Sequence, residues 1–249
     1  MKKFSYLLLS LLVGVFANAS LFASQLDTPA IENEKPVVVL LHGFGRSTFA
    51  MWKLASRLED AGYDVRRIGY GSLTRTPAQI IDDVAAQIDA CCRHRKTAVN
   101  FVGHSLGGLV IRAYLDNHLV DNLGRVVLMG TPNQGTELVD KYQNRWWMQF
   151  AGPTALTLGT AADSFPNRLP DPTYPVGIIA GVTSHDHDLI PGLDDGVVSV
   201  KSTKLKYGMS DFVLVKSGHS MMRYNREVAQ QTIHFLKTGQ FDHVPHSED

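Results

Sequence analysis

Six short apolar runs recur along the chain and alternate with segments whose apolar residues follow a helical spacing. The runs cover residues 35–41, 64–70, 97–102, 125–129, 176–180 and 212–215. Continuous runs of this kind are typical of strands buried on both faces of a sheet. Helical spacing is found over residues 47–61, 76–92, 106–117 and 221–236. The alternation predicts an α/β fold, with a mostly parallel central sheet flanked by helices in a single domain.

The alternation breaks between Asn133 and Pro175. This stretch holds a cluster of aromatic and apolar residues, followed by a proline-rich run. A structureless loop of this length is uncommon in a compact domain unless it has a function. We therefore predict that residues 133–175 form an insertion, a partly helical cap or lid.

The first 19 residues have a different character from the rest. Two lysines precede a mostly apolar stretch over residues 7–17, and Ala17-Asn18-Ala19 follows as a small-x-small cleavage pattern. This order predicts a signal peptide, so that residues 20–249 form the mature domain, which is periplasmic or secreted. The alternatives are an uncleaved anchor and a buried helix, although the apolar stretch is shorter than the roughly 20 residues that span a bilayer.

The charge balance and the number of cysteines limit the partners and the disulfide bonds that we expect. Basic and acidic residues number 24 each, so no nucleic-acid partner is expected. Cys91 and Cys92 are the only cysteines. Because neighbouring residues rarely satisfy disulfide geometry, we expect no long-loop crosslink. Their spacing from Ile88 predicts small apolar side chains that face the core at a helix end.

The third apolar run is followed by a serine with glycines on both sides, within VNFVGHSLGG from Val99 to Gly108. A predicted strand precedes Ser105 and a predicted helix follows it. A G-x-S-x-G pattern in this setting is typical of a nucleophile elbow, in which a sharp turn lifts the hydroxyl clear of the sheet. An ordinary tight turn is the alternative.

A nucleophilic serine needs a base and an orienting carboxylate, which follow it along the chain in this architecture. His219 comes just after the last apolar run, at the same predicted edge of the sheet as Ser105. For the acid, the residues alone leave Asp194 and Asp195 open, and the Asp-Gly pair that follows is also a turn signal.

Two backbone N–H groups are needed to bind a developing oxyanion. One is expected from Leu106, the residue after the serine. The other is expected from Phe44, in the loop His42-Gly43-Phe44 after the first strand. A plain strand-to-helix turn is the alternative for that loop.

One segment invites a metal interpretation. Two histidines alternate with two aspartates over residues 185–188. A polar loop near the site is the simpler interpretation, since zinc normally takes a third protein ligand on a firmer scaffold. We expect neither a metal nor another cofactor.

Five motifs together resemble a known family. LLHGFGRS, GHSLGGLV, MGTPNQGTE, DDGVVSV and SGHSMM occur in the order seen in α/β-hydrolase serine lipases and esterases, over about Val37 to Leu236. The resemblance implies an α/β-hydrolase fold, Asp195 as the acid, and the cap at residues 133–175. Met221 stands where some secreted lipases of this group have a calcium-binding aspartate two positions after the histidine, which argues against calcium.

The resemblance also implies hydrolysis of a small-molecule acyl ester or lipid, with transient contact to a lipid surface as a further option. The same machinery serves thioesterases, phospholipases, amidases and acyltransferases, and a non-catalytic binding protein is the remote alternative. Candidate substrate contacts are His104 and four residues of the insertion, for which packing onto the core is an equal alternative: Trp146, Trp147, Met148 and Phe150.

Overall fold

A single parallel sheet forms the centre of the domain. The computed structural model describes residues 34–183 and 189–244. Its six strands lie side by side in the order β2-β1-β3-β4-β5-β6, and all neighbours are parallel. In chain order they are β1 (Val37–Leu41), β2 (Asp64–Ile68), β3 (Val99–His104), β4 (Leu123–Met129), β5 (Val176–Val182) and β6 (Met209–Lys216). The predicted α/β architecture is therefore confirmed.

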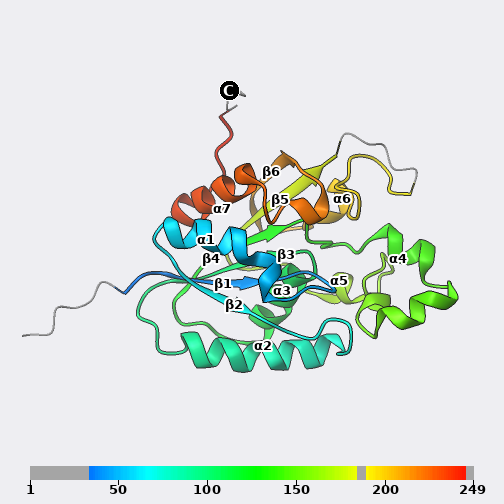
Figure 1. Ribbon diagram of the computed structural model, residues 1–249, viewed down its shortest axis with the longest axis horizontal. Coiled ribbons are helices and arrows are strands. Elements are labelled where there is room, and N and C mark those ends of the chain that lie inside the picture. Colours follow the sequence, from blue (N-terminus) through cyan, green and yellow to red (C-terminus); the bar gives the residue numbers. More distant parts are fainter. Residues whose placement is uncertain (1–33, 184–188, 245–249) are drawn as a thin grey trace, which may run out of the picture. The chain divides into compact units, whose positions relative to one another are not determined.

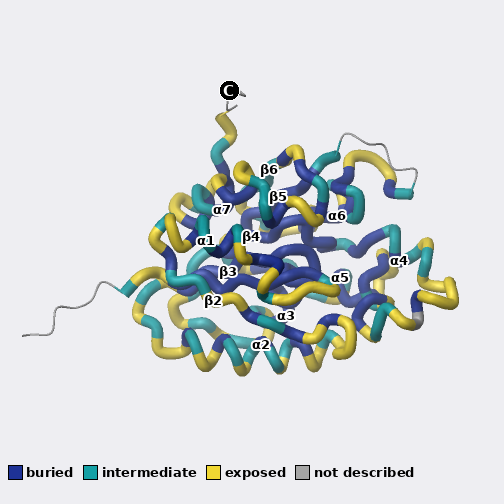
Figure 2. Tube along the Cα trace, in the orientation of Figure 1, coloured by how far each residue is buried: buried dark blue, intermediate teal, exposed yellow. Residues whose placement is uncertain are grey.

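Helices cover both faces of the sheet (Figure 1), which explains the continuous apolar runs. Val37, Val39 and Leu41 of β1 pack in a core cluster with α2 (Pro77–Cys92) and α3 (Leu106–Asn117). Val38 and Leu40 point the other way, into a cluster with α1 (Trp52–Asp60) and α7 (Arg226–Thr238). Both sets are fully buried, and Figure 2 shows the buried tube concentrated along the central strands.

Local signals set the helix ends. Thr76 and Gln79 form a capping box at the start of α2, so two backbone N–H groups there are satisfied by side chains. The last helix begins later than the spacing predicts: a 3-10 turn, η4 (His219–Met221), comes first, and the Asn225 side chain then caps α7. A second 3-10 turn, η1 (Thr48–Met51), precedes α1. Gly239 ends α7 in the left-handed conformation.

The segment between β4 and β5, called the insertion below, is partly helical. It contains α4 (Glu137–Tyr142), η2 (Trp146–Ala151), η3 (Ala155–Thr157) and α5 (Phe165–Arg168). Its first residues are hydrogen-bonded to the segment around α6 (Val200–Thr203): the Thr136 hydroxyl donates to the Val197 carbonyl at 2.7 Å, and the Asn133 amide donates to the Thr203 carbonyl at 2.7 Å. The base of the insertion is thus fixed to the loop that follows β5.

The cysteine prediction is wrong in one respect. A disulfide joins Cys91 to Cys92 in the last turn of α2, with the two Cα atoms 3.8 Å apart. Only Cys92 is buried in the core, while Cys91 is partly exposed. Helical spacing locates the two Cα atoms but does not reveal that the sulfurs bond. No long loop is crosslinked by this bond, as the sequence predicts.

Among the described residues, no helix is long and apolar enough to cross a membrane. The predicted signal peptide and the His185–Asp188 segment lie outside the described residues.

Candidate active site

The site lies at the point in the sheet where successive strands are added on opposite sides of β1. From β1 the chain moves to one neighbour, β2, and then crosses to the other, β3. The loops after β1 and β3 therefore leave in opposite directions, and such a switch point opens a crevice at the carboxyl ends of the strands. His42 follows β1 and Ser105 follows β3, so both predicted motifs flank this point.

Ser105 has a strained backbone. Its φ and ψ are 56° and −123°, and it is the one non-glycine residue with positive φ in the described part of the chain. The glycines around Ser105 allow main-chain segments to pass close to one another. A Cβ added at Gly103 would lie 2.5 Å from the Gly108 nitrogen, and one at Gly107 would lie 2.6 Å from the Leu41 carbonyl oxygen. The turn therefore exists only because these positions lack side chains.

Three side chains from distant parts of the sequence form one hydrogen-bonded row. Ser105 Oγ lies 3.0 Å from His219 Nε2, and His219 Nδ1 lies 2.7 Å from Asp195 Oδ2. All three residues are buried, at 9%, 9% and 3% exposure. In this row the serine hydroxyl donates to Nε2 while the Nδ1–H donates to the carboxylate.

The backbone of the loop after β5 holds Asp195 in place. Its Oδ1 accepts from the N–H groups of Val197 and Val198, at 3.0 and 2.8 Å. Its carbonyl accepts from the His219 N–H at 2.7 Å, so acid and histidine are also tied through the main chain. The neighbouring Asp194 instead accepts from the Gly196 N–H at 2.6 Å. The carboxylate at His219 is thus that of Asp195, the residue the resemblance implies.

The two expected oxyanion donors belong to segments that both approach Ser105. Leu106 is the first residue of α3, where a backbone N–H has no acceptor inside the helix. The loop that carries Phe44 reaches the serine from β1, since a Cβ added at Gly43 would lie 3.1 Å from the Ser105 Cβ. The start of α3 also favours negative charge at this point.

His104, a predicted substrate contact, is hydrogen-bonded within the protein. Its ring is 3% exposed, and its Nε2 lies 2.9 Å from the His219 carbonyl oxygen, to which it donates. The two imidazole rings are 4.9 Å apart. Burial, together with the nearby His219, holds the pKa of His104 well below its usual value, so the ring is neutral.

The apolar side chains of the insertion divide into two kinds. Trp146 and Phe150 are 75% and 73% exposed, and their rings meet edge to face at 6.2 Å. Trp147 is partly exposed and lies 5.6 Å from the Tyr142 ring. Met148 is buried in the main core cluster. Of the four candidates for substrate contact, Met148 thus packs on the core.

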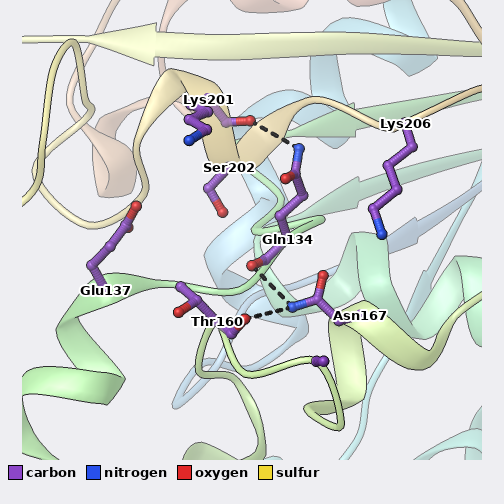
Figure 3. Close-up of a pocket in the computed structure, with 8 residues that line it drawn as sticks. Gln134, Glu137, Thr160, Asn167, Lys201, Ser202 and Lys206 are labelled. Atoms are coloured by element: carbon purple, nitrogen blue, oxygen red, sulfur yellow. Dashed lines mark hydrogen bonds between the residues drawn. The ribbon is translucent and has the colours of Figure 1, made fainter.

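A separate polar cavity of about 440 Å³ lies between the base of the insertion and α6 (Figure 3). The Asn167 amide donates to the carbonyls of Gln134 and Thr160 within it, and Gln134 donates in turn to the Lys201 carbonyl. These bonds join the end of the insertion to its start. Within the described residues, no cluster of histidine, cysteine and acidic side chains could hold a metal ion.

Two residues beside the site were not singled out by the sequence. His42 is fully buried and stacks on Tyr70, with ring centroids 4.3 Å apart. Burial lowers the pKa of His42. His42 lies in the motif LLHGFGRS, so the sequence indicates that it is near the site. Nothing in the local sequence distinguishes Tyr70 from other residues that end an apolar run.

Comparison with known proteins agrees with this architecture. Residues 36–169 match the family described as alpha/beta hydrolase fold, and the chain belongs to that family. No curated protein sequence matches the chain.

Solved structures with the same fold include several lipases and esterases. The mature lipase BlEst2 of Bacillus licheniformis is 21% identical, with 84% of this chain and 93% of that chain covered and a TM-score of 0.67. A structure from work on carboxylesterases of the thaumarchaeon Nitrososphaera gargenis is 16% identical, with coverages of 82% and 91% and a TM-score of 0.56. Phospholipase PlaB of Legionella pneumophila is 18% identical, with coverages of 68% and 45% and a TM-score of 0.51. At these identities the likeness concerns the fold.

Proposed function

We propose that the protein hydrolyses carboxylic esters through a Ser105-His219-Asp195 triad and an acyl-enzyme. The observation that carries this proposal is the continuous row of hydrogen bonds from the Ser105 hydroxyl through both nitrogens of His219 to Asp195. A nucleophile, a base and an orienting carboxylate in this order are the parts that acyl transfer needs. The fold and the lipases and esterases that share it are consistent with such chemistry.

The proposed reaction uses these groups in order. His219 Nε2 takes the proton as Ser105 Oγ attacks the ester carbonyl, and the carbonyl oxygen becomes an oxyanion between the N–H groups of Phe44 and Leu106. Collapse of this intermediate breaks the bond to the alcohol, which leaves with the proton from His219. Water then attacks the acyl-enzyme, giving its proton to His219, and the carboxylic acid is released as Ser105 recovers its proton. Asp195 holds the Nδ1–H tautomer and stabilises the imidazolium.

A fluorophosphonate probe, which reacts covalently with activated serines, tests this mechanism. We expect labelling of the native protein and none of Ser105→Ala, with kcat on a nitrophenyl ester lowered about a million-fold. Ser56→Ala on α1 is the matched control and should label as the parent does. Labelling that persists in Ser105→Ala would refute the assignment.

The acid is tested by a pair of amides. Asp195→Asn keeps the side-chain size but no longer stabilises the correct histidine tautomer, so kcat should fall about 10⁴-fold. Asp194→Asn makes the same carboxylate-to-amide change at the neighbouring residue and should keep most of the activity. Equal losses in both variants would contradict the role of Asp195.

Substrate class and location belong to the same proposal. Turnover of matched esters, thioesters, phospholipids and amides separates an esterase from the thioesterase, phospholipase and amidase options, and product analysis with an added alcohol acceptor separates it from an acyltransferase. We also propose that residues 1–19 are removed on export, and N-terminal sequencing of the protein recovered from the producing cells tests this.

A further inference from the structure

We infer that His42 is a positioning residue for the oxyanion hole: its Nδ1–H holds the Gly43 carbonyl and so fixes the peptide that carries the Phe44 N–H. This inference rests on the proposed function, because the Phe44 N–H matters only if an oxyanion forms there.

The hydrogen bond joins His42 to its own neighbour in sequence. His42 Nδ1 lies 2.9 Å from the Gly43 carbonyl oxygen, and the imidazole is fully buried. A peptide unit is planar, and in its trans form the carbonyl and the N–H point in opposite directions. Fixing the Gly43 oxygen on the side of the imidazole therefore turns the Phe44 N–H away from it. The same loop lies against Ser105, as the approach of Gly43 to the Ser105 Cβ shows.

The partners of the other ring nitrogen determine the tautomer. The Tyr70 N–H donates to His42 Nε2 at 3.4 Å, so Nε2 is the acceptor and Nδ1 carries the proton. Burial lowers the pKa of His42, which keeps this neutral form. The Tyr70 ring stacks on the imidazole with an interplanar angle of 12°, and the Tyr70 hydroxyl donates to the His42 carbonyl. Tyr70 thus fixes both the orientation and the protonation of His42.

The segment that holds His42 is itself well anchored. Gln87 on α2 donates to the Gly69 carbonyl at 2.8 Å and accepts from the Gly69 N–H at 3.4 Å. The Ser72 hydroxyl accepts from the Gly45 N–H at 2.9 Å, on the far side of Phe44. Residues 69–72 therefore hold the loop 42–45 at both ends. A hole that is formed before substrate binds requires no reorganisation during the reaction.

Because residue 43 is a glycine, the peptide that follows it needs a hydrogen bond to hold its orientation. A Cβ added at Gly43 would lie 3.0 Å from His104 Nδ1 and 3.1 Å from the Ser105 Cβ, so a larger residue would press on the nucleophile and its neighbour. Glycine also gives the following peptide wide rotational freedom. Without a donor on the Gly43 carbonyl, that peptide can rotate and turn the Phe44 N–H away from the oxyanion.

Two substitutions separate positioning from packing. His42→Asn places an amide N–H near the position of Nδ1, whereas His42→Leu fills the space without a donor. We expect His42→Leu to lower kcat on nitrophenyl butyrate about 100-fold, the lower end of the loss of one oxyanion-hole donor, with KM within about threefold. His42→Asn should recover at least about tenfold of that loss.

A trifluoromethyl ketone gives a readout that a purely structural role would not move. It forms a tetrahedral oxyanion adduct with Ser105, so its Ki should rise in His42→Leu in parallel with the loss of kcat, and fall again in His42→Asn. Val38→Ala, fully buried in the strand β1 that precedes His42, is the control for stability. It should lower Tm but leave kcat and Ki unchanged.

The outcomes are distinct. A native protein that neither turns over esters nor labels refutes the proposed function. A native protein that is active, with His42→Leu equal to it in kcat and Ki, or with His42→Asn no better than His42→Leu, overturns the role of His42. If His42→Leu does not fold, His42→Gln takes its place, because its longer amide reaches the position of Nε2 and leaves Nδ1 without a substitute. The same two outcomes then decide.

Discussion

The turn after β3 and the insertion after β4 both begin where a central strand ends, but they are held in different ways. The turn is fixed by backbone against backbone: Gly103 and Gly107 approach main-chain atoms too closely for any side chain. The insertion also has close main-chain contacts, since a Cβ added at Gly135 would lie 2.1 Å from the Gly159 carbonyl oxygen, but its two ends are in addition joined by a side chain from outside it, Arg112 on α3. Contact between main chains leaves a short local motif, whereas side-chain anchors are spread over the sequence.

The largest effect is expected from Gly103→Ala. The added methyl group would lie 2.5 Å from the Gly108 nitrogen, and neither backbone can move without displacing Ser105. We expect a loss of more than about 3 kcal/mol in the free energy of unfolding, measured by urea denaturation.

The matched change is Gly62→Ala, after α1. There φ is 97° but nothing lies within 4 Å of the new methyl group, so only backbone strain of about 1–2 kcal/mol is expected. Equal losses at the two positions would show that strain, and not contact, determines the effect at Gly103.

Arg112→Met should give the next largest effect. The buried guanidinium donates to Asn133 at the start of the insertion, at 3.0 Å to Oδ1, and to the carbonyls of Leu169 and Pro170 near its end, both at 3.1 Å. Methionine has a similar length and no donor, so the buried Asn133 amide oxygen and the two partly buried carbonyls lose their partner. We expect about 3 kcal/mol less stability and faster proteolysis within residues 141–157.

Conversion to lysine provides the control for charge. Arg112→Lys keeps the cation but cannot reach both ends of the insertion at once, so it should recover only part of the loss. Unchanged proteolysis in both variants would contradict the view that Arg112 anchors the insertion.

This contrast explains what could be predicted. Strands and helices followed from periodicity, since burial on two faces leaves a continuous apolar run in β1 and a helical pattern in α2. The row Ser105-His219-Asp195 was proposed from motif order, with Asp195 chosen by resemblance. The anchoring by Arg112, His42 and Tyr70 was not predicted, because each bond spans tens of residues or depends on a ring orientation that no local pattern encodes. The Cys91–Cys92 bond was missed for a different reason, because helical spacing places the two Cα atoms but not the two sulfurs.

The two buried histidines near Ser105 make stability depend on pH. His42 and His104 stay neutral in the fold because burial lowers the pKa of each, while in the unfolded chain both take up protons as pH falls through about 6.5. The unfolded state then binds more protons, so the free energy of unfolding falls as pH falls, by up to about 1.4 kcal/mol per pH unit for each histidine.

His104→Gln isolates one of these contributions. Glutamine can still donate to the His219 carbonyl but does not titrate, so the loss of stability between pH 6.5 and 5 should be less steep than in the parent. Urea denaturation at several pH values measures the slope. An unchanged slope would contradict the assignment of His104 as a neutral buried group.

The smallest effect is expected on the exposed face of the insertion. Trp146 is 75% exposed, so Trp146→Ser should change the free energy of unfolding by no more than about 0.5 kcal/mol. Met148, two residues on, is 7% exposed in the core, and Met148→Ala should lose at least about 2 kcal/mol. If both substitutions destabilise alike, the indole is part of the packing. Trp146→Ser can instead leave stability intact and raise KM for long-chain esters but not for short ones. In that case the exposed aromatic rings bind substrate, whereas Met148 stabilises the fold.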